Sequence, residues 1–300
     1  MASFWDNLSL KYKQGTVVTR LMFINIAVFI LLRVIFVVLS LFKWSGSDFI
    51  AFFQMPSDLK RLLQEPWTVF TYMFVHLDLL HILFNMLWLY FFGSMFLRWF
   101  RASQLVFVYI IGGLFGALFF SLFYNILPAF QGHDAQLMGA SASILALGIA
   151  VAIYRPDEPV PLLIFGTIRL KWLAIVLVGF DVLNLNGENA GGNLAHIGGA
   201  VGGLLFGLLL RNNLDVLRFV EPLFQNIKRI FRPRPKMKIT YQRPKNETAN
   251  RTTDVDQEYR DRKKADDMML DDILDKIKRS GYDSLTSKEK TFLFDSSRNH

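Results

Sequence analysis

The sequence contains no cysteine, and this absence excludes two kinds of chemistry. Without thiols, the chain can form no disulfide and can use no thiolate as a nucleophile or metal ligand. For the same reason, cysteine content gives no indication of the redox state of the compartment in which the protein works.

Charge is also scarce, because charged residues make up 19% of the 300 residues and apolar residues 52%. The scarcity is uneven, since residues 211–300 hold 21 of the 33 Lys and Arg and 15 of the 25 Asp and Glu. A stretch as apolar as residues 1–210 is not typical of a soluble protein. We therefore expect a membrane part followed by a polar tail.

The formal net charge of +8 arises mainly just after the last apolar run. Basic residues in that position are typical of a cytoplasmic membrane flank, so we expect the lipid bilayer, and no nucleic acid, as a partner. The apolar run at 21–42 is too long for the core of a cleaved signal peptide, and we expect no cleaved leader.

Six apolar segments are long enough, or nearly so, to cross a membrane as helices, which takes about 20 residues. They cover 20–42, 69–97, 104–126, 138–154, 170–186 and 194–210. The fourth and fifth are short, so the fourth is expected to begin below the membrane surface, within reach of water. The sequence predicts an all-α polytopic bundle of six transmembrane helices over 20–212, after an N-terminal tail at 1–19.

Lysine and arginine lie mostly on one side of this arrangement. They occur in the N-terminal tail, in the loops after the second and fourth segments, and after the sixth, whereas the loops after the third and fifth have none. Positive loops stay in the cytoplasm. We expect a multi-pass protein of the cell (inner) membrane with both termini cytoplasmic. The opposite loop at 43–68 has the pattern of short amphipathic helices.

After the membrane part, the sequence predicts a flexible basic linker at 213–264 and a small helical tail module at 265–300. Apolar residues recur at helical spacing between 266 and 279. Thr286 and Glu289 then have the spacing of a capping box, which predicts a second helix. A hairpin of this size has little core, so it is expected to dock elsewhere or to dimerise, and the oligomeric state stays open.

Polar side chains inside apolar segments are costly, which makes them candidates for function. His76, His81 and Asn85 fall in the outer half of the second segment. Ser141 and His196 fall at the outer ends of the fourth and sixth. Three separate pieces of chain thus bring polar groups to one leaflet. Each residue alone could be a helix cap or an interhelical hydrogen-bonding group, so the convergence carries the prediction.

Ser141 and His196 are the candidate catalytic pair, because an adjacent imidazole activates a serine hydroxyl. A GxxxG pattern at Gly199 and Gly203 predicts close packing of the fourth and sixth helices. That packing brings the His196 ring within reach of the Ser141 hydroxyl. No aspartate is obviously placed to orient His196. Asp181, near the outer end of the fifth segment, is the only candidate, and a structural hydrogen bond is its preferred interpretation. The sequence therefore predicts a Ser–His dyad.

Three groups are candidate donors to an oxyanion. The Ser141 backbone N–H is expected at a helix start, without an intrahelical partner. His81 and Asn85 are spaced i and i+4, so a ring N–H and an amide N–H share one helix face. His76 and Gly139 are expected to have structural roles near the site.

Other functions fit these residues less well. Three histidines at one depth could bind zinc, but His76 and His81 lack the i, i+4 spacing of a helical metal pair, so no metal or cofactor is expected. A transporter would show inverted repeats and helices broken at mid-membrane, which the sequence lacks. Arg33 lies within the first span, and we interpret it as a packing or snorkelling residue.

Taken together, the motifs resemble those of the rhomboid family of intramembrane proteases. The HxxxxHxxxN pattern is matched at 76–85, the GxSx pattern at 139–142 and the AHxxGxxxG pattern at 195–203. The resemblance extends over about residues 15–212. Two features differ, because Ala142 stands where many members have glycine and the first loop has no Trp-Arg pair.

The resemblance implies a serine endopeptidase that cleaves transmembrane protein substrates in or near their membrane helices. It implies Ser141 and His196 as the dyad, with Asn85, His81 and the Ser141 N–H around the oxyanion. It also implies a small residue before the cut and lateral entry near the fifth helix and the flexible loop at 187–193. The alternative is an inactive rhomboid-like chaperone or adaptor, although such relatives usually lack the nucleophile or the base.

Overall fold

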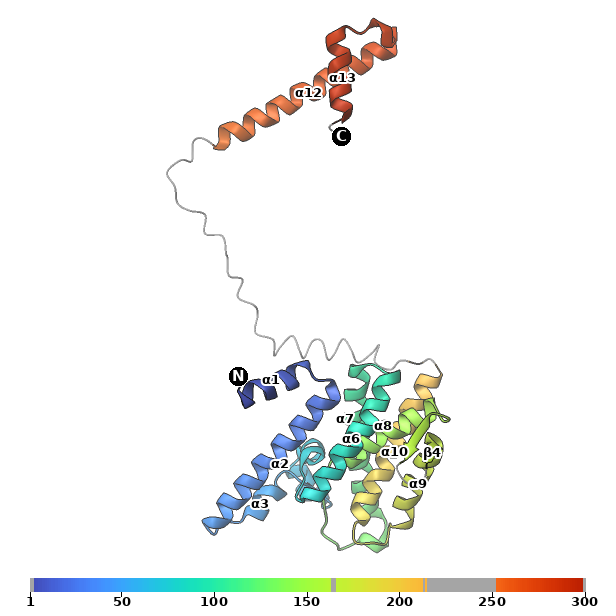
Figure 1. Cartoon of the computed structure of the whole chain (residues 1–300). Helices are drawn as coiled ribbons and strands as arrows, with labels where there is room; N and C mark the ends of the chain where they lie inside the picture. The colour runs from blue at the N-terminus through green and yellow to red at the C-terminus, as the bar shows by residue number, and fades with distance from the viewer. Residues whose placement is uncertain (1–2, 163–165, 213, 215–251, 299–300) are drawn as a thin grey trace. The chain divides into compact units, whose positions relative to one another are not determined.

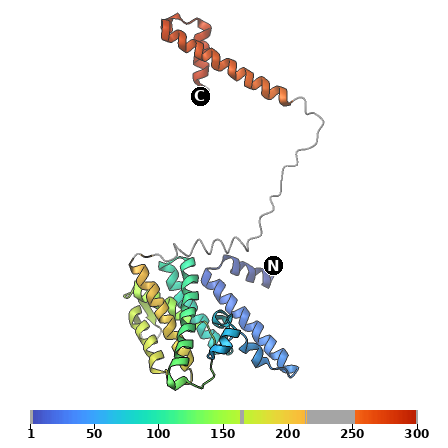
Figure 2. The same ribbon diagram turned by 180° about the vertical axis from the view of Figure 1, so that it is seen from behind.

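The computed structural model describes residues 3–162, 166–212, 214 and 252–298. The chain divides into two units, Met1–Arg232 and Pro233–His300, each mostly helical. The first unit is a bundle of helices, seen from two sides in Figures 1 and 2. Among its described residues, four helices are long and apolar enough to cross a membrane. This unit is therefore a polytopic membrane bundle.

The helices of the bundle are α1 Phe4–Gln14, α2 Val17–Leu41, α3 Gly46–Ala51, α4 Leu59–Gln64, α5 Thr68–Thr71, α6 Leu79–Trp99, α7 Ala102–Ile126, α8 Ser141–Tyr154, α9 Leu170–Leu183 and α10 Ala190–Arg211, with short 3-10 turns η1 Tyr72–Phe74 and η2 Pro128–Phe130. Two small antiparallel sheets pair β1 Met55–Pro56 with β2 Gln136–Leu137, and β3 Pro159–Leu162 with β4 Gly166–Arg169. The four candidate spans are α2, α6, α7 and α10.

The second predicted apolar segment does not form one helix. A short helical piece ends at η1, and α6 begins only at Leu79, after Asp78 in extended conformation at the N-cap. The Asp78 side chain makes no capping hydrogen bond to the first turn of α6. His76 therefore lies in the break before α6, and the prediction that it sits on the helix of His81 is wrong.

The last span begins earlier than predicted. Residues 190–193, expected within a flexible loop, form the first turn of α10. Packing explains this, because a Cβ on Gly191 would lie 2.9 Å from the Phe120 ring. Contact with α7 outweighs the low helix propensity of the glycine pair. His196 accordingly lies in the second turn of α10 and not at its end.

Helix α8 is the centre of the bundle, and 11 of its 14 residues are buried. At about 1.5 Å per residue it spans about 21 Å, less than the hydrocarbon thickness. Its alanines face the glycines of α10, and a Cβ on Gly199 or Gly203 would collide with the carbonyl oxygen of Ala142 or Ala146. The predicted close packing of these two helices is therefore present, backbone against backbone.

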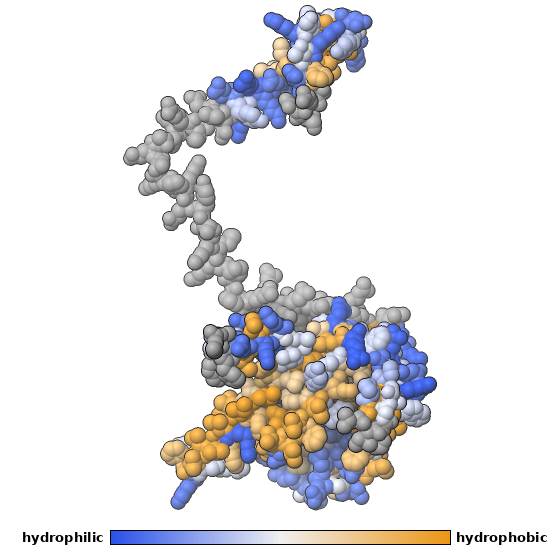
Figure 3. Space-filling view, viewed as in Figure 1, coloured by the Kyte–Doolittle hydropathy of each residue, from blue (hydrophilic) through white to orange (hydrophobic). Residues whose placement is uncertain are grey.

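Helix α2 stands at the edge of the bundle, and only four of its 25 residues are buried. Figure 3 shows the resulting apolar surface over α2, at the lower left of the view. Such a surface is typical of a helix that faces lipid. Arg33 lies on this exposed helix, with its guanidinium 5.8 Å from the Phe36 ring.

The β3–β4 hairpin, which the sequence analysis did not predict, follows α8. Asp157 before the hairpin contacts Arg169 at 3.1 Å and Lys171 at 2.8 Å. Hydrogen bonding from Lys171, helped by Arg169, lowers the pKa of the Asp157 carboxyl. Glu158 reaches Arg98 at the end of α6, at 3.3 Å. These contacts fix the end of the bundle where α6 and α8 finish.

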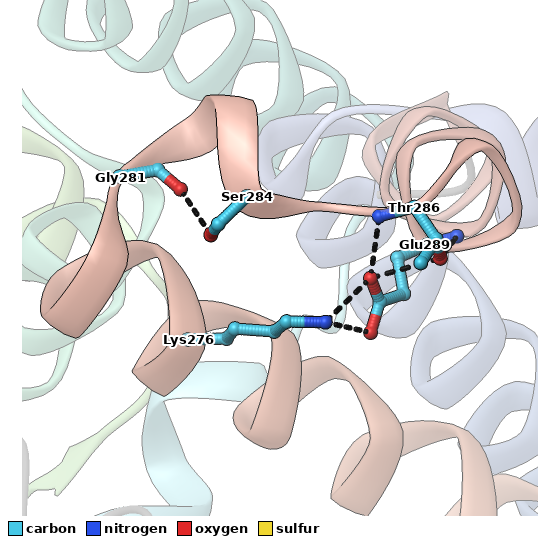
Figure 4. Close-up of polar contacts among 5 residues, drawn as sticks. All are labelled: Lys276, Gly281, Ser284, Thr286 and Glu289. Carbon is cyan, nitrogen blue, oxygen red and sulfur yellow. Dashed lines mark hydrogen bonds and ion pairs between the residues drawn. The ribbon is translucent and has the colours of Figure 1, made fainter.

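The second unit consists of α12 Thr252–Ser280, η3 Tyr282–Ser284 and α13 Ser287–Arg298. The predicted capping box is present, because the Thr286 N–H donates to Glu289 Oε2 at 2.7 Å and the Glu289 N–H donates to Thr286 Oγ1 at 3.4 Å (Figure 4). Lys276 Nζ also contacts Glu289 at 2.8 Å, which joins α12 to α13. Helix α12 begins within the predicted linker, of which residues 213 and 215–251 lie outside the described residues.

Candidate active site

The chain before Ser141 is held by a short extended segment. The β1–β2 pairing anchors this segment, and the Gly139 N–H donates to the Tyr72 carbonyl at 2.9 Å. Gly139 has φ +108°, and a Cβ there would lie 2.8 Å from His81 Nε2. Both the backbone conformation and the imidazole therefore require glycine at this position.

Ser141 is the first residue of α8, after Ala140 at the N-cap. Its backbone N–H is among those that have no partner within the helix. The positive end of the helix dipole lies at the same place. Because α8 is short and central, the Ser141 hydroxyl lies inside the bundle and is half-buried.

The structure brings Ser141 and His196 together, with Ser141 Oγ 2.7 Å from His196 Nε2. The opposite ring nitrogen, Nδ1, lies 2.8 Å from Asp181 Oδ1. A carboxylate accepts from Nδ1–H, which leaves the Nε2 lone pair to accept from the serine hydroxyl. Serine, imidazole and carboxylate thus form a continuous hydrogen-bonded chain from three helices, α8, α10 and α9.

Asp181 was the only acid that the sequence offered to orient His196, with a structural hydrogen bond as the preferred interpretation, and the structure places the two side chains in contact. Asp181 lies two residues before the end of α9, and His196 lies six residues after the start of α10. The predicted last span began at residue 194, which put His196 at the helix end and hid its position opposite Asp181.

His81 and Asn85 line the same cavity as Ser141. Asn85 Nδ2 donates to the His81 carbonyl at 2.9 Å, within the helix, so one amide N–H remains. The Asn85 Oδ1 is buried and has no hydrogen-bond partner among the described residues. The structure therefore brings both side chains to the cavity of the predicted nucleophile.

His76 is fully buried beneath the loop that precedes Ser141. Its Nε2 lies 3.4 Å from the Ala140 backbone nitrogen and accepts from that N–H, and its Nδ1 lies 3.3 Å from the Phe74 carbonyl. The ring thus joins the break before α6 to the start of α8. Within the described part of the chain, no cluster of three or more His, Cys, Asp or Glu side chains could hold a metal ion.

A cavity of about 590 Å³ contains the Ser141 and His196 side chains. Its apolar wall comes from α6, α8 and α9, with the side chains of Phe84, Trp88, Phe92, Ile144, Leu145, Leu177 and Phe180. The rest of the lining is largely polar and includes the Ser141, His196, His81 and Asn85 side chains. A cavity with an apolar wall and polar groups beside it is typical of a binding site that holds an apolar segment next to reactive groups.

Comparison with known proteins identifies similar chains. The Rhomboid domain model matches residues 63–213, which include the motif residues of α6, α8 and α10, and a family of unknown function (DUF6576) matches 253–299. RHOMBOID-like protein 12, mitochondrial, of Arabidopsis thaliana is 31% identical over 144 residues, 44% of this chain and 43% of the plant protein.

Two bacterial proteins named Rhomboid protease GlpG are also similar to this chain. The protein of Yersinia enterocolitica is 27% identical over 199 residues, 66% of this chain and 63% of the relative. The protein of Haemophilus influenzae is 26% identical over 170 residues, 50% and 73% of the two chains. The match thus spans less than two thirds of the Arabidopsis and Yersinia proteins.

Proposed function

The chain belongs to the rhomboid family, and on that premise we propose that it is an intramembrane serine endopeptidase with Ser141 and His196 as its catalytic pair. Family membership supports peptide hydrolysis in the membrane. The observation that carries the residue assignment is the 2.7 Å contact between Ser141 Oγ and His196 Nε2. A hydroxyl this close to an imidazole nitrogen can give up its proton as it attacks.

In the proposed reaction, Ser141 Oγ attacks the scissile carbonyl carbon while its proton passes to His196 Nε2. The resulting oxyanion is stabilised by the Ser141 N–H and by donors on His81 and Asn85. His196 then protonates the leaving amine. Water, activated by the same imidazole, hydrolyses the acyl-enzyme and restores the serine.

The proposed substrates are transmembrane helices of other proteins. The apolar wall of the cavity between α6 and α9 suits an unwound, apolar segment with a small residue before the cut. Helix α9 is a suitable side for entry, because only three of its 14 residues are buried. The proposed substrate class is therefore an apolar transmembrane segment that can unwind and that has a small residue before the cut.

We propose six spans, namely the four long helices with α8 and α9 added. Both termini are then cytoplasmic, and the site opens to the extracytoplasmic face of the cell membrane. The proposed division is a cytoplasmic tail at 1–19, a membrane domain at 20–212, a linker at 213–264 and a tail module at 265–300.

The test is cleavage of a transmembrane substrate by the full chain in proteoliposomes, with labelling of the enzyme by a serine-directed fluorophosphonate. We expect cleavage and labelling by the parent chain, and neither by Ser141→Ala or His196→Ala. Unchanged cleavage by Ser141→Ala would reject Ser141 as the nucleophile. A parent chain that retains the substrate, but neither cuts it nor reacts with the label, would instead support a chaperone or adaptor.

A further inference from the structure

We propose that Asp181 is a positioning residue for His196, so that the base is aligned only while α9 is docked against α10. The proposal rests on the proposed function and deepens it. The Asp181 carboxylate has no role yet in the proposed reaction. The Asp181 side chain is 9% exposed, and its Oδ1 lies 2.8 Å from His196 Nδ1.

A buried carboxylate needs hydrogen-bond donors, because desolvation of an unpaired charge costs several kcal/mol. The His196 Nδ1–H is such a donor. The bond has a direct effect on the other side of the ring, since it selects the tautomer with its lone pair on Nε2, facing Ser141. The opposite tautomer would present an N–H to Ser141 Oγ and could not accept the serine proton.

A second contact holds the same seam between the helices. Asn193 Nδ2 donates to the Asn184 carbonyl at 2.7 Å, and Asn193 is buried. Asn184 lies three residues after Asp181, and Asn193 lies three residues before His196. The two contacts are therefore successive links across one antiparallel helix pair, about one turn apart. Together they fix the height of the carboxylate relative to the imidazole.

During the reaction, the proton moves from Ser141 Oγ to His196 Nε2 and then to the leaving amine. The Asp181 carboxylate, which faces Nδ1, stabilises the imidazolium that forms between these steps. The cavity is lined by two further ionisable side chains, His81 on α6 and Asp78 at the N-cap of that helix. Among the described residues, Asp181 is the only carboxylate that contacts His196.

Helix α9 is the least enclosed of the helices around the cavity, which gives the contact a further consequence. Its outer side chains are exposed, including Trp172, Ile175, Val176 and Leu183. If α9 moves outward to admit a substrate, the carboxylate leaves with it. His196 then regains its correct tautomer and its counter-charge only when α9 returns. The base is therefore active only after α9 has closed over the substrate.

The test compares Asp181→Asn, Asp181→Glu and the parent chain in proteoliposomes. The readouts are kcat and KM for a transmembrane substrate, and the rate of fluorophosphonate labelling from about pH 5 to about pH 9. Asp134→Asn is the matched control, because it makes the same carboxylate-to-amide change at an exposed position in the segment before α8, away from the lining of the cavity.

We expect Asp181→Asn to lower kcat and the labelling rate about 10- to 100-fold at neutral pH, with little change in KM. The acidic limb of its pH profile should move to lower pH, because the imidazolium has lost its counter-charge. Asp181→Glu should recover part of the rate, and Asp134→Asn should match the parent.

Two results would overturn the proposal. One is a parent-like rate and pH profile for Asp181→Asn. The other is a rate loss with a lower thermal midpoint and an unmoved pH profile, which would mean that Asp181 only supports packing. The Ser141→Ala variant distinguishes failure of the proposed function from failure of the Asp181 proposal. Continued cleavage by Ser141→Ala rejects the proposed function. If Ser141→Ala does not cleave, the Asp181 variants decide whether Asp181 positions His196.

Discussion

At the scale of single residues, Gly139 holds the backbone that presents Ser141. Its φ of +108° is strained for other residues, and a Cβ would press on the His81 ring at 2.8 Å. Gly132 is a useful comparison, because it has φ +80° but nothing within 4 Å of a Cβ. Substituting each of the two glycines therefore distinguishes the effect of backbone strain, present at both positions, from the effect of a collision with His81, present only at Gly139.

We predict that Gly139→Ala lowers fluorophosphonate labelling at least about 10-fold, since it displaces an oxyanion donor. Gly132→Ala should cost about 1 to 2 kcal/mol of stability, for its left-handed backbone alone, and leave labelling unchanged. Labelling and thermal unfolding of both variants provide the measurement. Equal labelling by the two variants would mean that the His81 contact has no part in the activity.

Sequence reasoning predicted most of the site residues but not all of their relations. Ser141, His196, His81 and Asn85 were expected at one depth, and they line one cavity. Their common depth follows from the topology, because it depends only on the direction in which each span crosses the membrane. The contact of His196 with Asp181 depends on where α10 begins, and helix ends are the least determined part of a hydropathy pattern.

At the scale of secondary-structure elements, the seam between α8 and α10 governs the site. We predict that Gly199→Ala costs about 1 to 3 kcal/mol or more and abolishes labelling, because its Cβ would collide with the Ala142 carbonyl oxygen and separate Ser141 from His196. Gly202→Ala is the control on the same helix, with a Cβ 3.3 Å from the Phe115 side chain. Thermal midpoints and labelling should separate the two variants.

If Gly202→Ala impairs labelling as much as Gly199→Ala, the close approach of α8 and α10 does not determine the catalytic distance. The general helix propensity of alanine would raise stability in both variants, so it cannot mimic the predicted difference.

Glu289 gives the tail helices a pH dependence. Hydrogen bonds from Lys276 and then Thr286 lower the pKa of Glu289 from 4.5 to about 2. A lowered carboxyl pKa means that the stabilisation is complete above about pH 4.5 and is lost as the pH falls toward about 2. Hydrogen exchange of α12 and α13 in the full chain, corrected for intrinsic rates, should show protection falling through this range.

Glu289→Gln should remove that pH dependence, and Asp283→Asn, an exposed neighbour in η3, should keep it. If protection in the Glu289→Gln variant still falls between about pH 4.5 and about pH 2, another group is responsible.

The elements themselves were predictable to different degrees. Long apolar runs predicted α2 and α7 to within a few residues, because burial in lipid dictates their composition. The break at 75–78 and the β3–β4 hairpin were missed. Both depend on tertiary contacts, such as the bond between His76 and the Ala140 N–H, which leave little trace in local composition.

At the scale of the whole molecule, the absence of cysteine makes the topology directly measurable. We predict that Ser47→Cys reacts with a membrane-impermeant maleimide in intact cells. Thr167→Cys and Ser280→Cys should react only after permeabilisation, because six spans place them on the cytoplasmic side. Labelling of each variant reports only on its single introduced cysteine, since the parent chain has no thiol. Reaction of Thr167→Cys in intact cells would contradict the proposed orientation.

The contact of Ala142 and Ala146 with Gly199 and Gly203 places main chain against main chain at these positions. The separation of the two backbones that carry Ser141 and His196 is thus set by direct main-chain contact between α8 and α10. Warming should leave this backbone separation unchanged until α8 and α10 part, so that its loss and the unfolding of the bundle coincide as one event.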